Sequence, residues 1–354
     1  MLREWINAVA RTIEGLSAVR SDRQALVFLD QRWRHHGAHS GYLVASGSGR
    51  SIPRENRLLP YPISRCVARI KQDREWEQRL IIQLMLRAGN AKVLHLVDGD
   101  FDTWFYRSRA NWLDTRITAT FHQTEDKLAD IARCVKTGSL DGIVCVSRAQ
   151  MPLLEHLVPE GRCVFIPHGV DTDFFSGSPP VSPADGPLLL AVGAHRRDFK
   201  TLIAAAKIIK SNRSDVRFRL IGPKDAVQAV AQEGIVEVMS NLSDSELRDA
   251  YRESYMLFLP LEAATANNAL LESMASARPA VITDLPAIHE YTTADAAVFC
   301  NPGDAQSHAD AALRLLSDES VALKMGRAAH DKVQEFSWLN VRSLLIRFLV
   351  DVAN

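Results

Sequence analysis

Short apolar segments alternate with longer helical patterns along most of this 354-residue chain. The segments hold four to six residues, many of them β-branched, and they are apolar on both faces, which is typical of strands buried in a parallel sheet. A helical pattern at 243–254 opens with an N-cap signature at Ser243 or Ser245. Such alternation predicts a doubly wound α/β fold. The predicted strands lie at 25–30, 92–97, 116–121, 142–146, 163–166, 188–192, 216–221, 235–238, 256–260, 279–283 and 296–300.

The alternation breaks once, at residues 167–187, where Pro, Gly, Ser and Asp dominate and no periodic pattern remains. Such a composition is typical of a linker between domains. We therefore predict two Rossmann-like domains, with ligands bound beyond the carboxyl ends of the strands in a cleft between them. The chain length suits two domains better than one small core.

Charge and cysteine content narrow the function classes. Lys plus Arg and Asp plus Glu each total 42, so the chain has no overall attraction to nucleic acid. The five cysteines form no CxxC pair, and their odd number argues against a disulfide framework. We expect reduced, mostly buried thiols in a cytoplasmic protein. No signal peptide or membrane span is predicted, because the chain lacks an apolar run of suitable length.

The segment 264–279, ATANNALLESMASARP, follows an apolar strand and opens a helix. Asn267 and Asn268 stand at the mouth of this helix, where unpaired backbone N–H groups can bind a phosphate. Glu272 lies about one turn deeper, on the face of Asn268, where its carboxylate could accept two hydrogen bonds from a ribose diol. The alternative interpretation is a plain N-capped helix with Glu272 in solvent.

Five stretches in chain order resemble glycosyltransferase family 4, within the GT-B superfamily. They are 145–175, 188–209, 241–261, 267–291 and 336–341. The resemblance is good over residues 85–354 and loose before them. It implies two Rossmann-like domains facing a cleft, spanning 1–175 and 176–335, with a C-terminal helix at 336–354 that packs back on the first domain. It also implies retaining sugar transfer from a nucleoside diphosphate sugar, with no resident cofactor and no metal.

The resemblance assigns Glu272 to the nucleotide ribose, as the second Glu of the family's two-Glu signature. The first Glu would fall at position 264, which is Ala264 here. Glu262 could substitute for it if the loop is longer. This difference from the family's signature affects the expected contact with the hydroxyl groups of the transferred sugar. The expected donor-binding residues are Gly193, Arg196, Arg197, Glu262, Asn267, Asn268, Ala269, Leu270 and Glu272.

Three residues are expected to take part in catalysis. Arg196 and Arg197 match the family's phosphate-binding cations, and their charges would stabilise the leaving diphosphate. The alternative is that one of them is a solvent-facing loop charge. His122 ends a predicted strand, where the family often carries a His beside the transferred sugar. It would hydrogen-bond the sugar or orient the acceptor, unless it is only a satisfied polar group.

The acceptor side is expected in the first domain, at Gly41, Tyr42, His39 and Asp100. Gly41 and Tyr42 belong to a predicted glycine-rich turn facing the cleft. His39 and its neighbours at 35 and 36 could be read as a metal cluster, but the GT-B resemblance favours loop residues that contact solvent or acceptor. Asp100 closes a DGD sequence that we interpret as a strand-end loop.

Residues 50–90 are rich in Lys and Arg, with Trp76 and apolar residues interleaved. This pattern predicts either an amphipathic surface helix or a surface for peripheral contact with the inner face of a membrane. Three functions are weighed: a glycosyltransferase acting on a glycan, a lipid-linked glycan or a small molecule; a non-catalytic protein that binds a nucleotide sugar; and a sugar-nucleotide epimerase or hydrolase.

Overall fold

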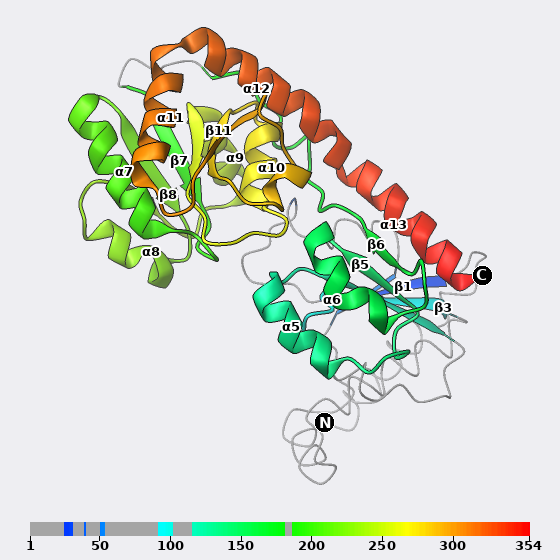
Figure 1. Ribbon diagram of the computed structural model, residues 1–354. Coiled ribbons are helices and arrows are strands. Elements are labelled where there is room, and N and C mark those ends of the chain that lie inside the picture. Colours follow the sequence, from blue (N-terminus) through cyan, green and yellow to red (C-terminus); the bar gives the residue numbers. More distant parts are fainter. Residues whose placement is uncertain (1–24, 31–38, 40–49, 54–90, 102–114, 181–185) are drawn as a thin grey trace, which may run out of the picture.

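The computed structural model describes residues 25–30, 39, 50–53, 91–101, 115–180 and 186–354. These residues form two sheets of six strands each, and every strand pairing is parallel. Helices cover both faces of each sheet (Figure 1). The predicted doubly wound α/β fold with two domains is therefore confirmed.

The first sheet has the strand order β2-β1-β3-β4-β5-β6. Successive residues of β3 point to opposite faces, so Val93 packs with α13 while Leu94 packs with α5 and α6. The strands are β1 (Ala25–Asp30), β2 (Arg50–Pro53), β3 (Ala91–Leu96), β4 (Arg116–Phe121), β5 (Gly142–Cys145) and β6 (Cys163–Phe165); the helices are α5 (Glu125–Cys134), η2 (Arg148–Gln150), α6 (Met151–Leu154), η3 (Glu155–Leu157) and α13 (Trp338–Ala353).

The second sheet has the strand order β12-β11-β10-β7-β8-β9. Helices α7, α8 and α11 cover one face, α9 and α10 cover the other, and α12 contributes residues to both clusters. The strands are β7 (Leu188–Val192), β8 (Arg217–Ile221), β9 (Glu237–Met239), β10 (Met256–Leu259), β11 (Ala280–Thr283) and β12 (Ala297–Cys300); the helices are α7 (Phe199–Asn212), α8 (Lys224–Ala231), α9 (Asp244–Glu253), α10 (Asn268–Ala275), η4 (Ile288–Glu290), α11 (Ala305–Ser317), α12 (Glu319–Val333) and η5 (Gln334–Phe336).

The C-terminal helix α13 returns to the first sheet (Figure 1). Trp338 and Phe348 pack there against the buried valines of β3 and β5. The fit is close, because a Cβ added to Gly169 would lie 2.4 Å from the Trp338 ring. The linker and the returning chain also pair directly, since Val170 N donates to Phe336 O at 2.9 Å and Trp338 N donates to Val170 O at 3.1 Å.

Two expectations from the sequence concern single features of the fold. Ser243 rather than Ser245 caps α9, because its hydroxyl accepts from Glu246 N and the Glu246 carboxylate accepts from Ser243 N. Of the four cysteines within the described ranges, Cys145 and Cys300 are buried and the other two are half-buried, and all four are free thiols. No helix in these ranges has the length and apolar character needed to cross a membrane.

Candidate active site

The loops that follow β4, β7 and β10 meet between the two domains. His122 directly follows β4, Gly193 directly follows β7, and Thr265 lies in the loop between β10 and α10. The Thr265 hydroxyl donates to the carbonyl oxygen of His122 at 2.7 Å. The loop before α10 in the second domain therefore contacts the turn after β4 in the first domain, which we call the His turn. The expected placement of these residues at carboxyl ends of parallel strands brings them to one site.

Arg197 points to the mouth of α10. Its Nε donates to Val192 O at 2.8 Å and its Nη1 to His195 O at 3.1 Å, while Nη2 lies 3.5 Å from Asn267 Oδ1. Gly193 makes room for this arrangement, since its φ is +89° and an added Cβ would lie 2.9 Å from Arg197 Nη2. Burial lowers the pKa of Arg197 to about 10, so the guanidinium is still charged at neutral pH.

Asn267 caps the N-terminus of α10, and the side chains of the first helical turn pack into the core. Asn267 Oδ1 accepts from Leu270 N at 3.2 Å, which is an N-cap bond. Ala269 and Leu270 are buried, so a ligand could reach them only through backbone atoms. Asn268 is the first helical residue and is half-buried. A phosphate at this end of the helix would therefore meet backbone N–H groups and the Arg197 guanidinium.

Glu272 is buried, with 5% of its surface exposed, and Tyr251 Oη donates to its Oε2 at 2.8 Å. The alternative with Glu272 in solvent is wrong. Burial raises the pKa of Glu272 to about 7, although the Tyr251 hydrogen bond and the Arg197 charge both lower it. When it is ionised, this carboxylate can accept hydrogen bonds from hydroxyl groups of a ligand.

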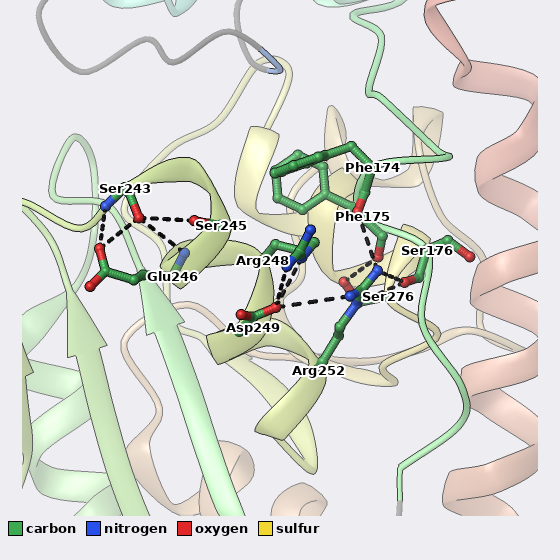
Figure 2. Close-up of polar contacts among 10 residues, drawn as sticks. All are labelled: Phe174, Phe175, Ser176, Ser243, Ser245, Glu246, Arg248, Asp249, Arg252 and Ser276. Carbon is green, nitrogen blue, oxygen red and sulfur yellow. Dashed lines mark hydrogen bonds and ion pairs between the residues drawn. The ribbon is translucent and has the colours of Figure 1, made fainter.

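Helix α9, which carries Tyr251, is fixed to the linker (Figure 2). The Arg252 guanidinium donates to Ser176 O at 2.5 Å, and Arg248 lies over the Phe174 ring at 5.1 Å. The other face of Phe174 stacks on His39, with ring centroids 3.7 Å apart. The hydroxyl that holds Glu272 therefore comes from a helix anchored at several points.

Arg196 points away from α10 and toward the first domain. Its Nη2 donates to the Asp126 carboxylate and, at 3.4 Å, to Thr124 Oγ1. Its carbonyl oxygen accepts from Glu262 N at 3.0 Å. The Glu262 side chain is exposed. The two neighbouring arginines thus take different directions, and in this structure only Arg197 faces the mouth of α10.

His122 is held by its backbone and by its ring. Asp100 Oδ2 accepts from His122 N at 2.7 Å, and the ring Nε2 donates to Val97 O at 2.8 Å. The ring also contacts His168 edge-on, with centroids 6.2 Å apart.

The residues expected on the acceptor side take different places. Asp100 is buried, burial raises its pKa, and its oxygens accept from the backbone N–H groups of His122 and Gln123, so it supports the His turn. His39 Nδ1 lies 2.7 Å from Asp171 Oδ2 in the linker. Gly41, Tyr42 and most of 50–90 lie outside the described residues, as do the two histidines at 35 and 36. No group of metal-ligating side chains occurs among the residues that the structure describes.

Sequence reasoning missed three residues at this site. Tyr251 could be read only as part of the apolar face of a helix, and Thr265 stood among small residues of the signature loop. Asp126 belongs to the acidic first turn of α5, a common feature of helix N-termini that signals no particular partner.

Two family models match the chain. The model described as Glycosyltransferase Family 4 matches residues 31–174, and the one described as Glycosyl transferases group 1 matches residues 186–318. The first covers most of the first domain and the second covers most of the second domain. Together they account for the greater part of the chain.

The chain is similar in sequence to one characterised protein and in fold to several solved structures. The phosphatidyl-myo-inositol mannosyltransferase of Mycobacterium leprae (strain TN) is 26% identical over 337 residues, covering 88% of this chain and 84% of that protein. Sucrose-phosphate synthase from Thermosynechococcus elongatus has a TM-score of 0.67 at 16% identity, covering 97% of this chain and 92% of the other. Anabaena Alr3699/HepE in complex with UDP-glucose has a TM-score of 0.67 at 12% identity, covering 92% and 99%. The two solved structures share the fold.

Proposed function

Because this chain belongs to the family 4 and group 1 glycosyltransferases, we propose that it transfers a sugar from a nucleoside diphosphate sugar, with retention of configuration and without a metal ion. The observation that carries this proposal is the arrangement at α10. The half-buried Arg197 guanidinium faces the helix mouth beside the capping Asn267, and the Glu272 carboxylate lies buried one turn behind.

In this proposal the donor diphosphate binds at the mouth of α10. The Arg197 guanidinium and the first backbone N–H groups of the helix are donors suited to phosphate oxygens. Glu272 accepts hydrogen bonds from the ribose hydroxyls. The Tyr251 hydroxyl supports this role, because it occupies one side of the carboxylate and fixes its orientation. The complex of Alr3699/HepE with UDP-glucose supports a nucleotide-sugar donor in proteins of this fold.

Charge stabilisation is the main chemical contribution of this site. As the bond between the anomeric carbon and the phosphate oxygen breaks, negative charge grows on the departing diphosphate. Arg197 can neutralise it, which is the function a metal ion has in other phosphate chemistry. The acceptor oxygen forms its bond on the same face, and its proton passes to the leaving phosphate oxygen.

His122 binds or orients reactants in this scheme and is not the general base. In this proposal the imidazole, oriented by its hydrogen bond to Val97 O, contacts a sugar hydroxyl. Three contacts from Asp100, Val97 and Thr265 hold the residue in place. Such fixation supports a positioning role, because transfer rates depend strongly on geometry.

For the acceptor we favour a lipid-linked molecule over a free glycan or a small molecule. The reason is the name of the relative from Mycobacterium leprae, whose acceptor is a phosphatidyl-myo-inositol. In this proposal the enzyme works in the cytoplasm, at the inner face of a membrane. The replacement of the first signature Glu by Ala264 leaves the sugar hydroxyls without their expected partner, and the exposed Glu262 is two residues away.

The test is a thermal-shift panel with UDP, GDP, ADP, TDP and their common sugar conjugates, each with and without EDTA. Binding to the folded state raises the melting temperature. We expect one nucleotide to raise the melting temperature, by the same amount with and without EDTA. The Glu272→Gln variant should show no such rise. Glu233→Gln is the matched control, since Glu233 is exposed and pairs with Lys207. No shift from any nucleotide would refute the donor site, and NMR of the product's anomeric proton would test retention.

A further inference from the structure

The Arg196–Asp126 ion pair joins the two domains at the candidate site. Arg196 lies between β7 and α7 of the second domain, and Asp126 lies in the first turn of α5 in the first domain. The contact is partly open to water, with 24% of the Arg196 side chain and 58% of the Asp126 side chain exposed. A soluble anion can therefore reach it.

Asp126 is ionised at neutral pH and is oriented by a hydrogen bond. The Thr124 hydroxyl donates to Asp126 Oδ1 at 2.5 Å, and this hydrogen bond is the largest of the effects that lower the pKa of Asp126. The Arg196 guanidinium lowers it further. The carboxylate is therefore ionised at every pH at which an enzyme of this kind would be assayed, and it occupies the guanidinium much as a phosphate oxygen would.

Arg196 has features that an ion pair with Asp126 does not require. Its φ is +56°, in the left-handed region that non-glycine residues rarely adopt. Its Nε is buried and has no hydrogen-bond partner among the described residues. A planar guanidinium offers parallel donors to a bidentate oxyanion, and here Asp126 uses only one edge of it. A diphosphate that displaces Asp126 can accept from more than one of these donors.

We propose that Asp126 is an internal substitute for the donor's diphosphate: it holds Arg196 in the donor-free enzyme and releases it when the donor binds. This inference rests on the proposed function. It makes Asp126 a positioning residue that lowers donor affinity while it keeps Arg196 beside the cleft.

The size of the effect follows from the exposure of the pair. A partly exposed ion pair contributes little, and its loss corresponds to about a twofold to fivefold change in an equilibrium constant. The donor must break this pair, so Asp126→Asn should bind the nucleoside diphosphate about twofold to fivefold more tightly than wild type. The difference should shrink as salt rises from about 50 mM to about 500 mM, because salt screens exposed charges.

The experiment is isothermal titration calorimetry of the full-length protein with UDP, GDP, ADP and TDP. Asp130→Asn is the matched control, because Asp130 lies on the same helix and pairs with the exposed Arg133. The Asp130→Asn variant also loses one negative charge on α5, and its affinity for the nucleotide should equal that of wild type. Asp126→Asn is also measured in an Arg196→Gln background, where the gain in affinity should vanish.

The measured affinities either support or overturn the proposed role of Asp126. Tighter binding by Asp126→Asn that requires Arg196 supports the inference. Equal or weaker binding by Asp126→Asn overturns it, and so does a gain of the same size in the Arg196→Gln background, since Asp126 would then act only as a distant charge. If wild type binds none of the four nucleotides, the proposed function itself fails and takes the inference with it.

Discussion

Replacing Glu272 by Gln should stabilise the protein above neutral pH and weaken its binding of nucleotide. The substitution keeps the shape of the side chain and an oxygen that can accept from the Tyr251 hydroxyl, and it removes the ionisable group. In wild type, burial raises the pKa of Glu272 from 4.5 to about 7. The folded state therefore binds a proton that the unfolded state has released, between about pH 4.5 and about pH 7.

The sign and size of the effect follow from linkage. A carboxyl group whose pKa is raised on folding makes the free energy of unfolding fall as pH rises through that window. Each pKa unit corresponds to about 1.4 kcal/mol, so a rise from 4.5 to about 7 destabilises wild type by on the order of 3 kcal/mol above pH 7. Gln has no such dependence. The stability of Glu272→Gln relative to wild type should therefore grow by about 2 to 3 kcal/mol between about pH 5 and about pH 8.

Urea unfolding followed by circular dichroism at those two pH values measures the gap between the proteins. Glu233→Gln again serves as the control, because Glu233 is exposed and its variant should show no pH-dependent gap. The reasoning is refuted if the gap for Glu272→Gln is equal at both pH values. The same variant should bind the nucleoside diphosphate less tightly, because the amide has an NH2 donor where the carboxylate has its second acceptor oxygen, and it lacks the negative charge.

Two kinetic predictions concern other residues of the site. Arg197→Ala should lower turnover more than Glu272→Ala does, because its charge matters most as the diphosphate leaves, and a turnover equal to wild type on a confirmed donor would contradict that assignment. Thr265→Val removes the hydroxyl that bonds to the His122 carbonyl, so kcat should fall about tenfold with little change in the donor's KM. Thr265→Ser should restore kcat, whereas a loss that serine does not restore would point to packing rather than positioning.

Most of the fold could be predicted because buried parallel strands leave a simple pattern. A strand such as Leu188–Val192 is apolar on both faces, and each predicted segment overlaps an observed strand. The strand β2, Arg50–Pro53, was not predicted, since an edge strand with Arg and Pro lacks that pattern. The sequence carries no local sign of such a strand, because its pairing with β1 determines it.

The site was predicted less completely, and contacts between distant segments explain why. Glu272 and Asn267 could be identified from their spacing in one helix. The hydrogen bond from Tyr251 depends on how α9 and α10 pack, and the Asp126 contact of Arg196 depends on how the two domains meet. The two arginines are neighbours in the sequence, but the left-handed backbone at Arg196 turns them apart, and nothing in their residue types predicts which one faces the helix.

The return of α13 to the first sheet has a consequence for how the chain folds during synthesis. A ribosome delivers the strands of the first domain long before residues 338–353, so the apolar face formed by Val93, Val144 and Val146 lacks its cover until those residues have been synthesised. The usual order, in which the N-terminal domain is completed first, is therefore reversed here, and the second domain can finish while the first is still incomplete. A nascent or truncated chain that lacks its last 17 residues, 338–354, would expose this face to chaperones and to aggregation.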